Sequence, residues 1–505
     1  MDKRKSKLNI SVSIAFRLIT LVMSIVTQRL LIQFCGNEVN GLNALYISIV
    51  GFLAVAELGI GSAITFCMYK PIVEGNQEQV SALYFLFRRL YRLVGLVILV
   101  AGLGLTPFIH HFAKDYEQVD VNMQSTFVLM LISTVLTYLF SAKTSLINAY
   151  KNNYITTSIS SGGLILQCAL QMISLVITQS FEWYLVCRII AVCAQWAITE
   201  LITRKKYYPI VSNKQKLNAS GQAEVLKSAK AMFIHKIGGL LVNTADSIVI
   251  STFLGVTVLG LYSNYVTVLN AMTGTIVLVF YSLTSVIGHL FAKEGSRTTR
   301  RYFEAFHLLN FLLGIVFYLG YYAIVDNLVT VFFGEGLTVA RELTFVVSFN
   351  GFVAFLRQSG LTFRDATGTF YNDRWKPVFE GFLNVILSVV FIRWMGVTGV
   401  IVATIITNLL ICHIVEPYVL YRHAFGASPK RHYIRNYAMI AIFAAALLML
   451  HFTMVTMDNQ WLELLVNGCI SVGISGVVCL LTMLRYKDLL SLLLGMRGKK
   501  TNLSY

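Results

Sequence analysis

The sequence predicts an all-α membrane protein that crosses the bilayer about fourteen times. Three observations lead to this fold class. Of the 505 residues, 56% are hydrophobic and only 13% are charged, whereas a soluble domain carries roughly a quarter charged residues. The chain also contains repeated apolar stretches near the length of about 20 residues that a membrane helix needs. Finally, Lys and Arg gather in alternate loops, as expected where those loops face the cytoplasm.

Fourteen apolar stretches have the length of a span. The first seven cover residues 9–34, 41–67, 90–113, 124–148, 155–178, 182–203 and 229–254. The other seven cover residues 258–291, 303–333, 342–363, 375–395, 397–420, 434–456 and 461–484. Several of these are longer than the bilayer requires, so we expect tilted helices or helix ends that extend into water.

The distribution of basic residues predicts the orientation. In the segments assigned to the outside, the only basic residues are Lys114, Arg341 and Arg393. The loops and tails assigned to the inside hold the remaining basic residues of the loops, including Arg204, Lys205 and those near the end of the chain. An even number of spans then places both termini in the cytoplasm. The net charge of +17 fits loops that face an anionic leaflet, so no nucleic-acid partner is predicted.

An internal repeat divides the chain. An offset of 219 residues aligns FCGNEVNGLNALY (residues 34–46) with FLGVTVLGLYSNY (residues 253–265) and pairs Gly41 with Gly260. Each segment lies between the first two spans of its half, and both run in the same sense, so the halves are parallel repeats of six helices. The predicted domains are a six-helix lobe at 1–206, a cytoplasmic linker at 207–228, a second six-helix lobe at 229–422, two extra membrane helices at 434–484 and a cytoplasmic tail at 485–505.

The basic residues in the loops and near the ends of the spans, among them Lys376, are counted with the loops, and five basic residues then lie inside the predicted spans: Arg17, Arg29, Arg188, Lys236 and Arg357. A charge at mid-bilayer costs at least roughly 2.5 kcal/mol, so such residues usually face the bundle interior or a wet cavity. The offset of 219 places Arg17 and Lys236 at equivalent positions. We therefore predict a cationic cavity that attracts an anion.

Polar residues accompany these cations on single helical faces. Ser24 and Gln28 follow Arg17 on the first span, and Asn243 and Ser247 follow Lys236 on the seventh. Their spacing is that of one side of a helix. Such a polar face is unfavourable against lipid, so the two faces are predicted to line one cleft.

Acidic residues leave an alternative interpretation open. Glu57 lies at about the depth of Arg17, and Asp246 could pair with Arg29, Arg188 or Lys236, so the cations could form ion pairs that only fix helix packing. The same two acids are the candidates for binding H⁺ or Na⁺. The sequence contains no P-loop, paired metal motif or nucleophile elbow, so no catalytic residue, cofactor or metal is predicted.

The repeated hairpin, the segment TADSIVISTFLG (residues 244–255) and the arrangement of six, six and two spans together resemble the Wzx-type polysaccharide flippases of bacteria. These O-antigen or capsule repeat-unit translocases belong to the multidrug, oligosaccharidyl-lipid and polysaccharide (MOP) exporter superfamily. The resemblance implies a MATE/MOP-like fold in which two lobes surround a cationic cavity. It also implies a function: flipping undecaprenyl-diphosphate-linked glycans from the inner to the outer leaflet by alternating access.

By the same resemblance, Arg17, Lys236 and Arg357 would bind the diphosphate, and the two last helices would help hold the lipid tail. The location would be the bacterial inner membrane, with membrane lipids and other polysaccharide-assembly proteins as candidate partners.

Three alternatives remain open. Lipid II flippases share the fourteen spans and the cationic cavity. Drug antiporters have twelve spans and typically a proline in the first helix, whereas the first proline here is Pro71. A membrane enzyme of polysaccharide assembly would more typically carry a large outer loop or a soluble domain. The prediction is therefore a transporter and not an enzyme.

Overall fold

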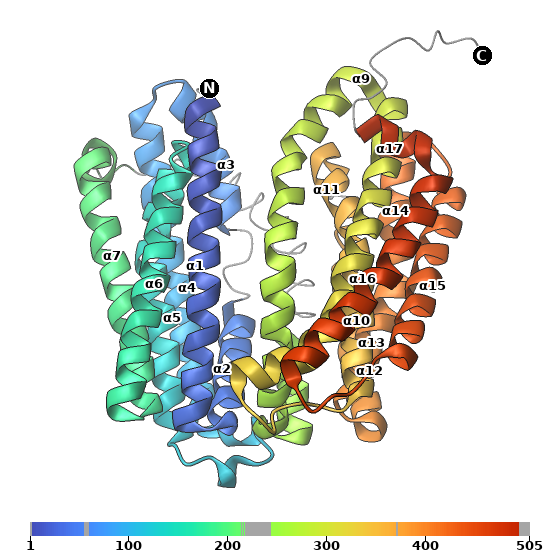
Figure 1. Ribbon diagram of the computed structural model, residues 1–505. Coiled ribbons are helices and arrows are strands. Elements are labelled where there is room, and N and C mark those ends of the chain that lie inside the picture. The colour runs from blue at the N-terminus through green and yellow to red at the C-terminus, as the bar shows by residue number, and fades with distance from the viewer. Residues whose placement is uncertain are drawn as a thin grey trace. The chain divides into compact units, whose positions relative to one another are not determined.

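The computed structural model describes residues 3–54, 60–213, 215, 217, 244–369 and 372–493, and its regular elements in these ranges are all helices (Figure 1). Helices are suited to lipid because they satisfy their backbone N–H and C=O groups internally. Among the described residues, nine helices are long and apolar enough to span a membrane, and the segments Ile19–Cys35 and Thr244–Leu254 are shorter apolar helices. The predicted all-helical, multi-pass membrane fold is confirmed, while the number of fourteen crossings stays a prediction.

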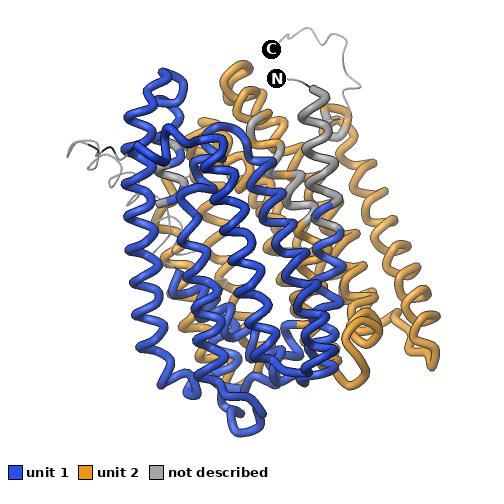
Figure 2. The backbone as a smooth tube through the Cα atoms, turned by 90° about the vertical axis from the view of Figure 1, so that its left-hand side faces the viewer, with its two compact units in different colours: residues 1–263 blue, residues 264–505 orange. Residues whose placement is uncertain are grey.

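The chain divides into two compact units, residues 1–263 and 264–505 (Figure 2). The predicted lobes at 1–206 and 229–422 are defined by the sequence repeat rather than by compactness, and their boundaries stay a prediction. The first unit extends to residue 263 and so includes the first hairpin and residues 253–263 of the second copy.

Unit 1 is a bundle of long helices. Its elements are α1 (Lys3–Cys35), α2 (Asn37–Leu53), α3 (Ile60–Val73), α4 (Gln77–Leu105), the 3₁₀ segments η2 (Thr106–Phe112) and η3 (Tyr116–Gln118), α5 (Met123–Ala149), α6 (Asn153–Thr178), α7 (Phe181–Ser212), the helix Thr244–Leu254 and the first turns of α9. Helix α6 packs against α1 and α7, and α5 packs against α4 and α7. Aromatic side chains, among them Phe87, Tyr91 and Tyr138, fill the core beneath α4 and α5.

Polar residues begin several of these helices. The Asn122 side chain accepts hydrogen bonds from the backbone N–H groups of Gln124 (3.1 Å) and Ser125 (3.0 Å) at the start of α5. Asn459 does the same for Trp461 (3.0 Å) and Leu462 (3.2 Å) at the start of α16. Such side chains satisfy N–H groups that the first turn of a helix leaves without partners.

Unit 2 contains the rest of α9 and the C-terminal helices. They are α9 (Val256–Phe333), α10 (Arg341–Leu356), α11 (Gln358–Thr367), α12 (Lys376–Met395), α13 (Val397–Thr407), the π-helical turns η5 (Asn408–Cys412) and η6 (Leu420–Phe425) on either side of α14 (His413–Val419), α15 (Lys430–Thr453), α16 (Gln460–Arg485) and α17 (Lys487–Leu493). Helix α9 is broken at Gly295, which has φ 76° and ψ −177°. The break lies between the predicted spans 258–291 and 303–333.

The core of unit 2 lies between α9, α10 and α15. Phe352 and Phe443 stack with their ring centroids 3.8 Å apart and an interplanar angle of 5°, and Phe311 and Tyr318 contact the edge of Phe352. Next to this core, α10 ends at Leu356 and α11 begins at Gln358. The predicted span 342–363 is therefore two helices that meet at Arg357.

Candidate functional site

Several predicted site residues, or their side chains, are not among those that the structure describes. Lys236, Asn243 and Glu57 lie outside the described residues. Arg17 belongs to α1, but its side chain also lies outside what is described. The equivalence of Arg17 and Lys236 across the repeats therefore stays a prediction.

The predicted polar stripe of α1 lies at the border of the helix's buried face. Thr20 and Thr27 are buried, Gln28 is half-buried, and Ser24 and Arg29 are exposed. The hydroxyl of Ser24 donates to the carbonyl of Leu21 (2.9 Å) in its own helix. The stripe thus reaches from the packed side of α1 onto its open side.

Arg188 is a half-buried cation near the start of α7. It lies one helical turn after Tyr184, a buried residue whose carbonyl accepts a hydrogen bond from the Gln171 side chain (3.2 Å). No carboxylate in the described part of the chain lies within 4.0 Å of the Arg188 guanidinium. Because a cation removed from water is stabilised by an opposite charge, Arg188 stays a candidate for binding an anion.

The two repeated hairpins pack directly on one another, an arrangement that we call the hairpin contact (residues 34–46 against 253–265). The Asn37 side chain donates to the carbonyl of Thr257 (2.9 Å), and the Asn40 side chain donates to the hydroxyl of Ser263 (3.0 Å). A Cβ atom on Gly41 would lie 2.7 Å from the backbone nitrogen of Gly260 and would also overlap the carbonyl oxygen of Val256. Only glycine permits this approach.

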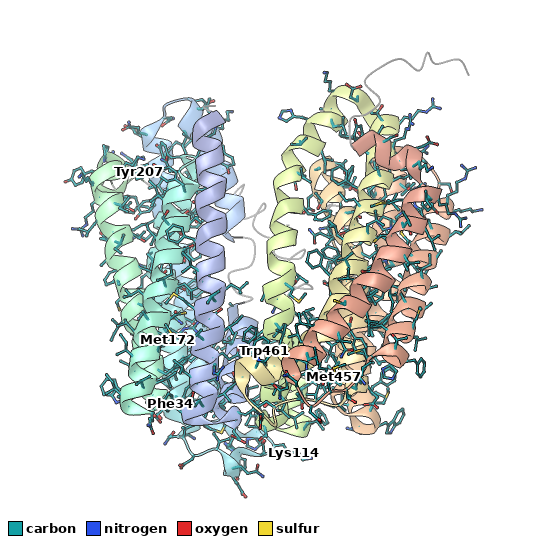
Figure 3. The ribbon with its side chains drawn as sticks, viewed as in Figure 1. Phe34, Lys114, Met172, Tyr207, Met457 and Trp461 are labelled. Atoms are coloured by element: carbon teal, nitrogen blue, oxygen red, sulfur yellow. The ribbon has the colours of Figure 1, made fainter. Side chains whose placement is uncertain are left out.

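A loop of the first repeat supports the same contact. Lys114, labelled in Figure 3, donates its backbone N–H to the carbonyl of Ser251 (3.2 Å). The Asp115 carboxylate accepts hydrogen bonds from the N–H groups of Val256 (2.6 Å) and Thr257 (3.0 Å), and from the Thr257 hydroxyl (2.6 Å). It therefore caps the start of α9, where a negative charge also interacts favourably with the helix dipole.

The Asp115 cap gives a first prediction. Asp115→Ala is expected to lower the free energy of unfolding by about 0.5–2 kcal/mol, the usual cost of losing an N-terminal cap. The measurement is the thermal or chemical unfolding of the purified protein. Asp120→Ala in the same loop is the control, since Asp120 is exposed. Equal stability of the two variants would contradict the capping role.

The helical face that includes Ser247 also contributes to the packing around the hairpin contact. Asp246 and Ser247 are half-buried, and Ser251, one turn further along, donates its hydroxyl to the carbonyl of Phe112 (2.6 Å). The outer end of this predicted cleft-lining face is thus part of the packing.

Arg357 lies in a buried network of four charges in unit 2. Its Nη2 and Nε atoms donate to the two carboxylate oxygens of Glu416 (2.6 and 3.2 Å), and its Nη1 lies 3.5 Å from Glu380. The Lys376 ammonium lies 2.6 Å from Glu416 and 2.8 Å from Glu380. Asn408 accepts a further hydrogen bond from Arg357. The two cations and two carboxylates balance, and Lys376, Glu380 and Glu416 are all buried.

Local helix geometry brings this network together. Glu416 lies in α14 between two π-helical turns, and Asn408 begins the first of them. Such π-helical turns are rare and often occur at functional sites. Lys376, Glu380 and Glu416 were not predicted as site residues, although all three lie within the predicted spans 375–395 and 397–420. The signal in the sequence was that these two acids and one cation lie in the same half of the membrane by the predicted topology.

A histidine cluster adjoins this network. His413 donates from Nε2 to the carbonyl of Val353 (3.0 Å) and accepts at Nδ1 from Asn436 (2.9 Å), which fixes it as the neutral tautomer. The rings of His307 and His432 lie 4.7 Å apart. Together with Arg357 and Glu416, these side chains line a cavity of about 20 Å³, room for roughly one water molecule.

Comparison with known proteins places this geometry in a known fold. No protein-family model matches the chain, and no curated protein sequence matches it significantly. Solved structures do. The lipid II flippase MurJ in an inward closed conformation matches with a TM-score of 0.62 and 15% identity over 95% of this chain and 99% of the other.

Two further matches belong to the MOP superfamily by their descriptions. An inward-facing multidrug resistance MATE family transporter matches with a TM-score of 0.64 and 13% identity over 81% of this chain and 97% of the other. A transporter from Pyrococcus furiosus matches with a TM-score of 0.51 and 11% identity over 84% and 96%. The chain has the fold of MOP-superfamily transporters. At these identities the likeness shows the fold alone.

Proposed function

We propose that the chain is a flippase that moves undecaprenyl-diphosphate-linked oligosaccharide repeat units from the inner to the outer leaflet. The observation that carries this proposal is Arg188, a half-buried cation that has no carboxylate within 4.0 Å among the described residues. A diphosphate supplies the missing negative charge, and Arg recognises phosphate oxygens with several donors at once. Arg17, Lys236 and Arg29 are the other proposed ligands.

Arg357 enters this proposal in a different way. In the described conformation its donors are occupied by Glu416, Asn408 and Glu380. A diphosphate would have to displace Glu416 to reach it. We therefore assign Arg357 to a step in which the four-charge network opens, and the other cations to initial binding.

Alternating access is the proposed mechanism. The hairpin contact joins the two repeated hairpins through close backbone packing at Gly41 and Gly260, and the predicted topology places these hairpins on the outer side. Opening this contact while the opposite end closes would release the glycan outward. The lipid tail would stay in the membrane, while polar side chains such as Ser24, Gln28, Asn243 and Ser247 would face the sugar.

The remaining parts of the proposal follow the predicted topology. The protein would lie in the bacterial inner membrane with both termini in the cytoplasm, next to other polysaccharide-assembly proteins. H⁺ or Na⁺ would bind Asp246 or Glu57, or the membrane potential would act directly on the anionic cargo.

Lipid II is the second candidate cargo, and one observation favours it over drugs. The match to the lipid II flippase covers 95% of this chain, whereas the match to the inward-facing multidrug transporter covers 81%. The drug transporter thus leaves a larger part of this chain without a counterpart. This difference supports a lipid-linked cargo of either kind.

The cations give the second prediction. Arg188→Ala, Arg17→Ala and Lys236→Ala are each expected to lower export by roughly thirtyfold, because losing one charged contact to the diphosphate costs about 2 kcal/mol. The measurement is surface polysaccharide in a strain lacking the chromosomal gene, together with the lipid-linked precursor that accumulates inside. Arg422→Ala is the control, since Arg422 is exposed and is not one of the predicted cavity residues.

Two outcomes separate the candidates. Rescue of a strain depleted of its lipid II flippase would transfer the proposal to peptidoglycan precursor. Wild-type export by all three alanine variants at normal abundance would contradict a cationic diphosphate site.

A further inference from the structure

A large groove in unit 2 lies between α9, η6, α15 and α16 and encloses about 1000 Å³. Its described lining contains five cationic side chains and a single carboxylate, Glu304. The cations are Arg300, Lys430, Arg431, Arg435 and Arg485. They gather at helix ends, because α15 begins at Lys430 and α16 ends at Arg485.

The chain satisfies two of these cations, Arg300 and Arg435, only in part. The Glu304 carboxylate lies 3.6 Å from Nη1 of Arg435 and 3.9 Å from Nε of Arg300, beyond hydrogen-bond distance. The Nε atoms of Arg300 and Arg435 and Nδ1 of His432 are buried and have no hydrogen-bond partner in the described part of the chain. Buried polar atoms normally have partners, since leaving them without one is costly. An external group with several acceptor oxygens would supply partners for the two arginine Nε atoms.

Below the cations the groove is apolar. Ile434, Ala438 and Ile442 are spaced four residues apart and so lie on one face of α15, and Leu481 faces the same groove from α16. Ile434 is 74% exposed and Leu481 is 62% exposed. A small soluble anion would not contact this apolar face, whereas a hydrocarbon chain would bury it.

We propose that this groove binds one anionic glycerophospholipid, with its phosphodiester among the cations and one acyl chain along the Ile434–Ile442 face. Basic pockets between membrane helices on the cytoplasmic side bind anionic headgroups, and the predicted topology places these helix ends there. Arg357 is not among the described residues that line the groove, although His432 lines both the groove and the small cavity beside Arg357. The lipid site does not depend on which cargo the protein carries.

The headgroup contacts are tested on the purified full-length protein by native mass spectrometry with dioleoylphosphatidylglycerol. Arg431→Gln/Arg485→Gln removes two exposed cations of the groove, so folding should be unaffected. The dissociation constant is expected to rise about 30-fold, the ratio for two lost cations at about 1 kcal/mol each. Lys293→Gln/Arg422→Gln is the matched control, because it removes two exposed cations that do not line the groove and should bind as the wild type does.

The apolar wall is tested separately. Ile434→Ser/Leu481→Ser is expected to weaken binding of the dioleoyl lipid and to leave binding of dihexanoylphosphatidylglycerol unchanged. Three results would overturn the proposal: equal binding of dioleoylphosphatidylcholine, unchanged binding by the Arg431→Gln/Arg485→Gln variant, or displacement of the phospholipid by inorganic phosphate or undecaprenyl diphosphate at lower concentration.

Discussion

Gly41→Ala is expected to block transport although it adds only one methyl group. The added Cβ would lie 2.7 Å from the backbone nitrogen of Gly260 and would overlap the carbonyl oxygen of Val256. Backbone atoms cannot rotate away as a side chain can, so the hairpins would have to separate. Overpacking of this kind costs about 1–3 kcal/mol or more, which lowers the population with the hairpin contact formed by about fivefold to over a hundredfold.

The hairpin contact can be measured directly by crosslinking. Asn40 and Ser263 hydrogen-bond across it (3.0 Å), so Asn40→Cys/Ser263→Cys should form a disulfide in a background in which the eight native cysteines are replaced. Adding Gly41→Ala is expected to reduce crosslinking and transport together. Adding Gly104→Ala is the control, because a Cβ at Gly104 meets no atom within 4 Å. Full crosslinking with Gly41→Ala would show that the contact tolerates the methyl group.

The sequence repeat predicted the two hairpins but not the contact between them. Gly41 and Gly260 occupy equivalent positions at the offset of 219, and a repeat motif shows only that both copies have the same local structure. That they contact one another depends on Asn37, Asn40 and Asp115, whose partners lie more than 130 residues away. Such long-range hydrogen bonds leave no local pattern.

Hydropathy located the helices but not their breaks. The predicted span 124–148 is α5, Met123–Ala149, because both ends of this helix coincide with the change from apolar to polar residues. The predicted span 182–203 continues in the structure as Phe181–Ser212, since a helix can extend into water where hydropathy falls. The break at Arg357 and the π-helical turns on either side of α14 lie within apolar stretches, so an average over hydropathy does not detect them.

Charge counting identified Arg357 but not its partners. Lys376 was assigned to a loop, and the acids Glu380 and Glu416 lie on two helices that are distant in sequence from Arg357. Only the folded unit brings the four together at 2.6–3.5 Å. The sequence favoured a cavity cation at Arg357 and left ion pairing open, and the structure shows the ion-paired arrangement, with Glu380 and Glu416 as the acids.

Glu416→Gln is expected to destabilise unit 2 strongly. Glu416 accepts from Arg357 (2.6 and 3.2 Å) and Lys376 (2.6 Å) and is 4% exposed. Its neutralisation would leave two buried cations with Glu380 as their remaining carboxylate in the network. Removing one partner of a buried ion pair costs about 3–5 kcal/mol, and the free energy of unfolding of the purified protein should fall by that amount. Glu335→Gln, on an exposed loop, should have no such effect.

A charge-restoring second substitution distinguishes charge balance from simple packing. Glu416→Gln/Lys376→Met leaves Arg357 with Glu380, one cation with one carboxylate, so the double variant should be more stable than Glu416→Gln alone. Buried ion groups can often be replaced by apolar residues of similar volume without loss, which is why methionine suits position 376. If the two substitutions instead add their separate costs, the network is held by packing, and displacement of Glu416 by a diphosphate loses its electrostatic basis. If the double variant recovers stability, charge balance holds the network together. An incoming diphosphate would then neutralise the charge of Arg357 as Glu416 does in the described conformation.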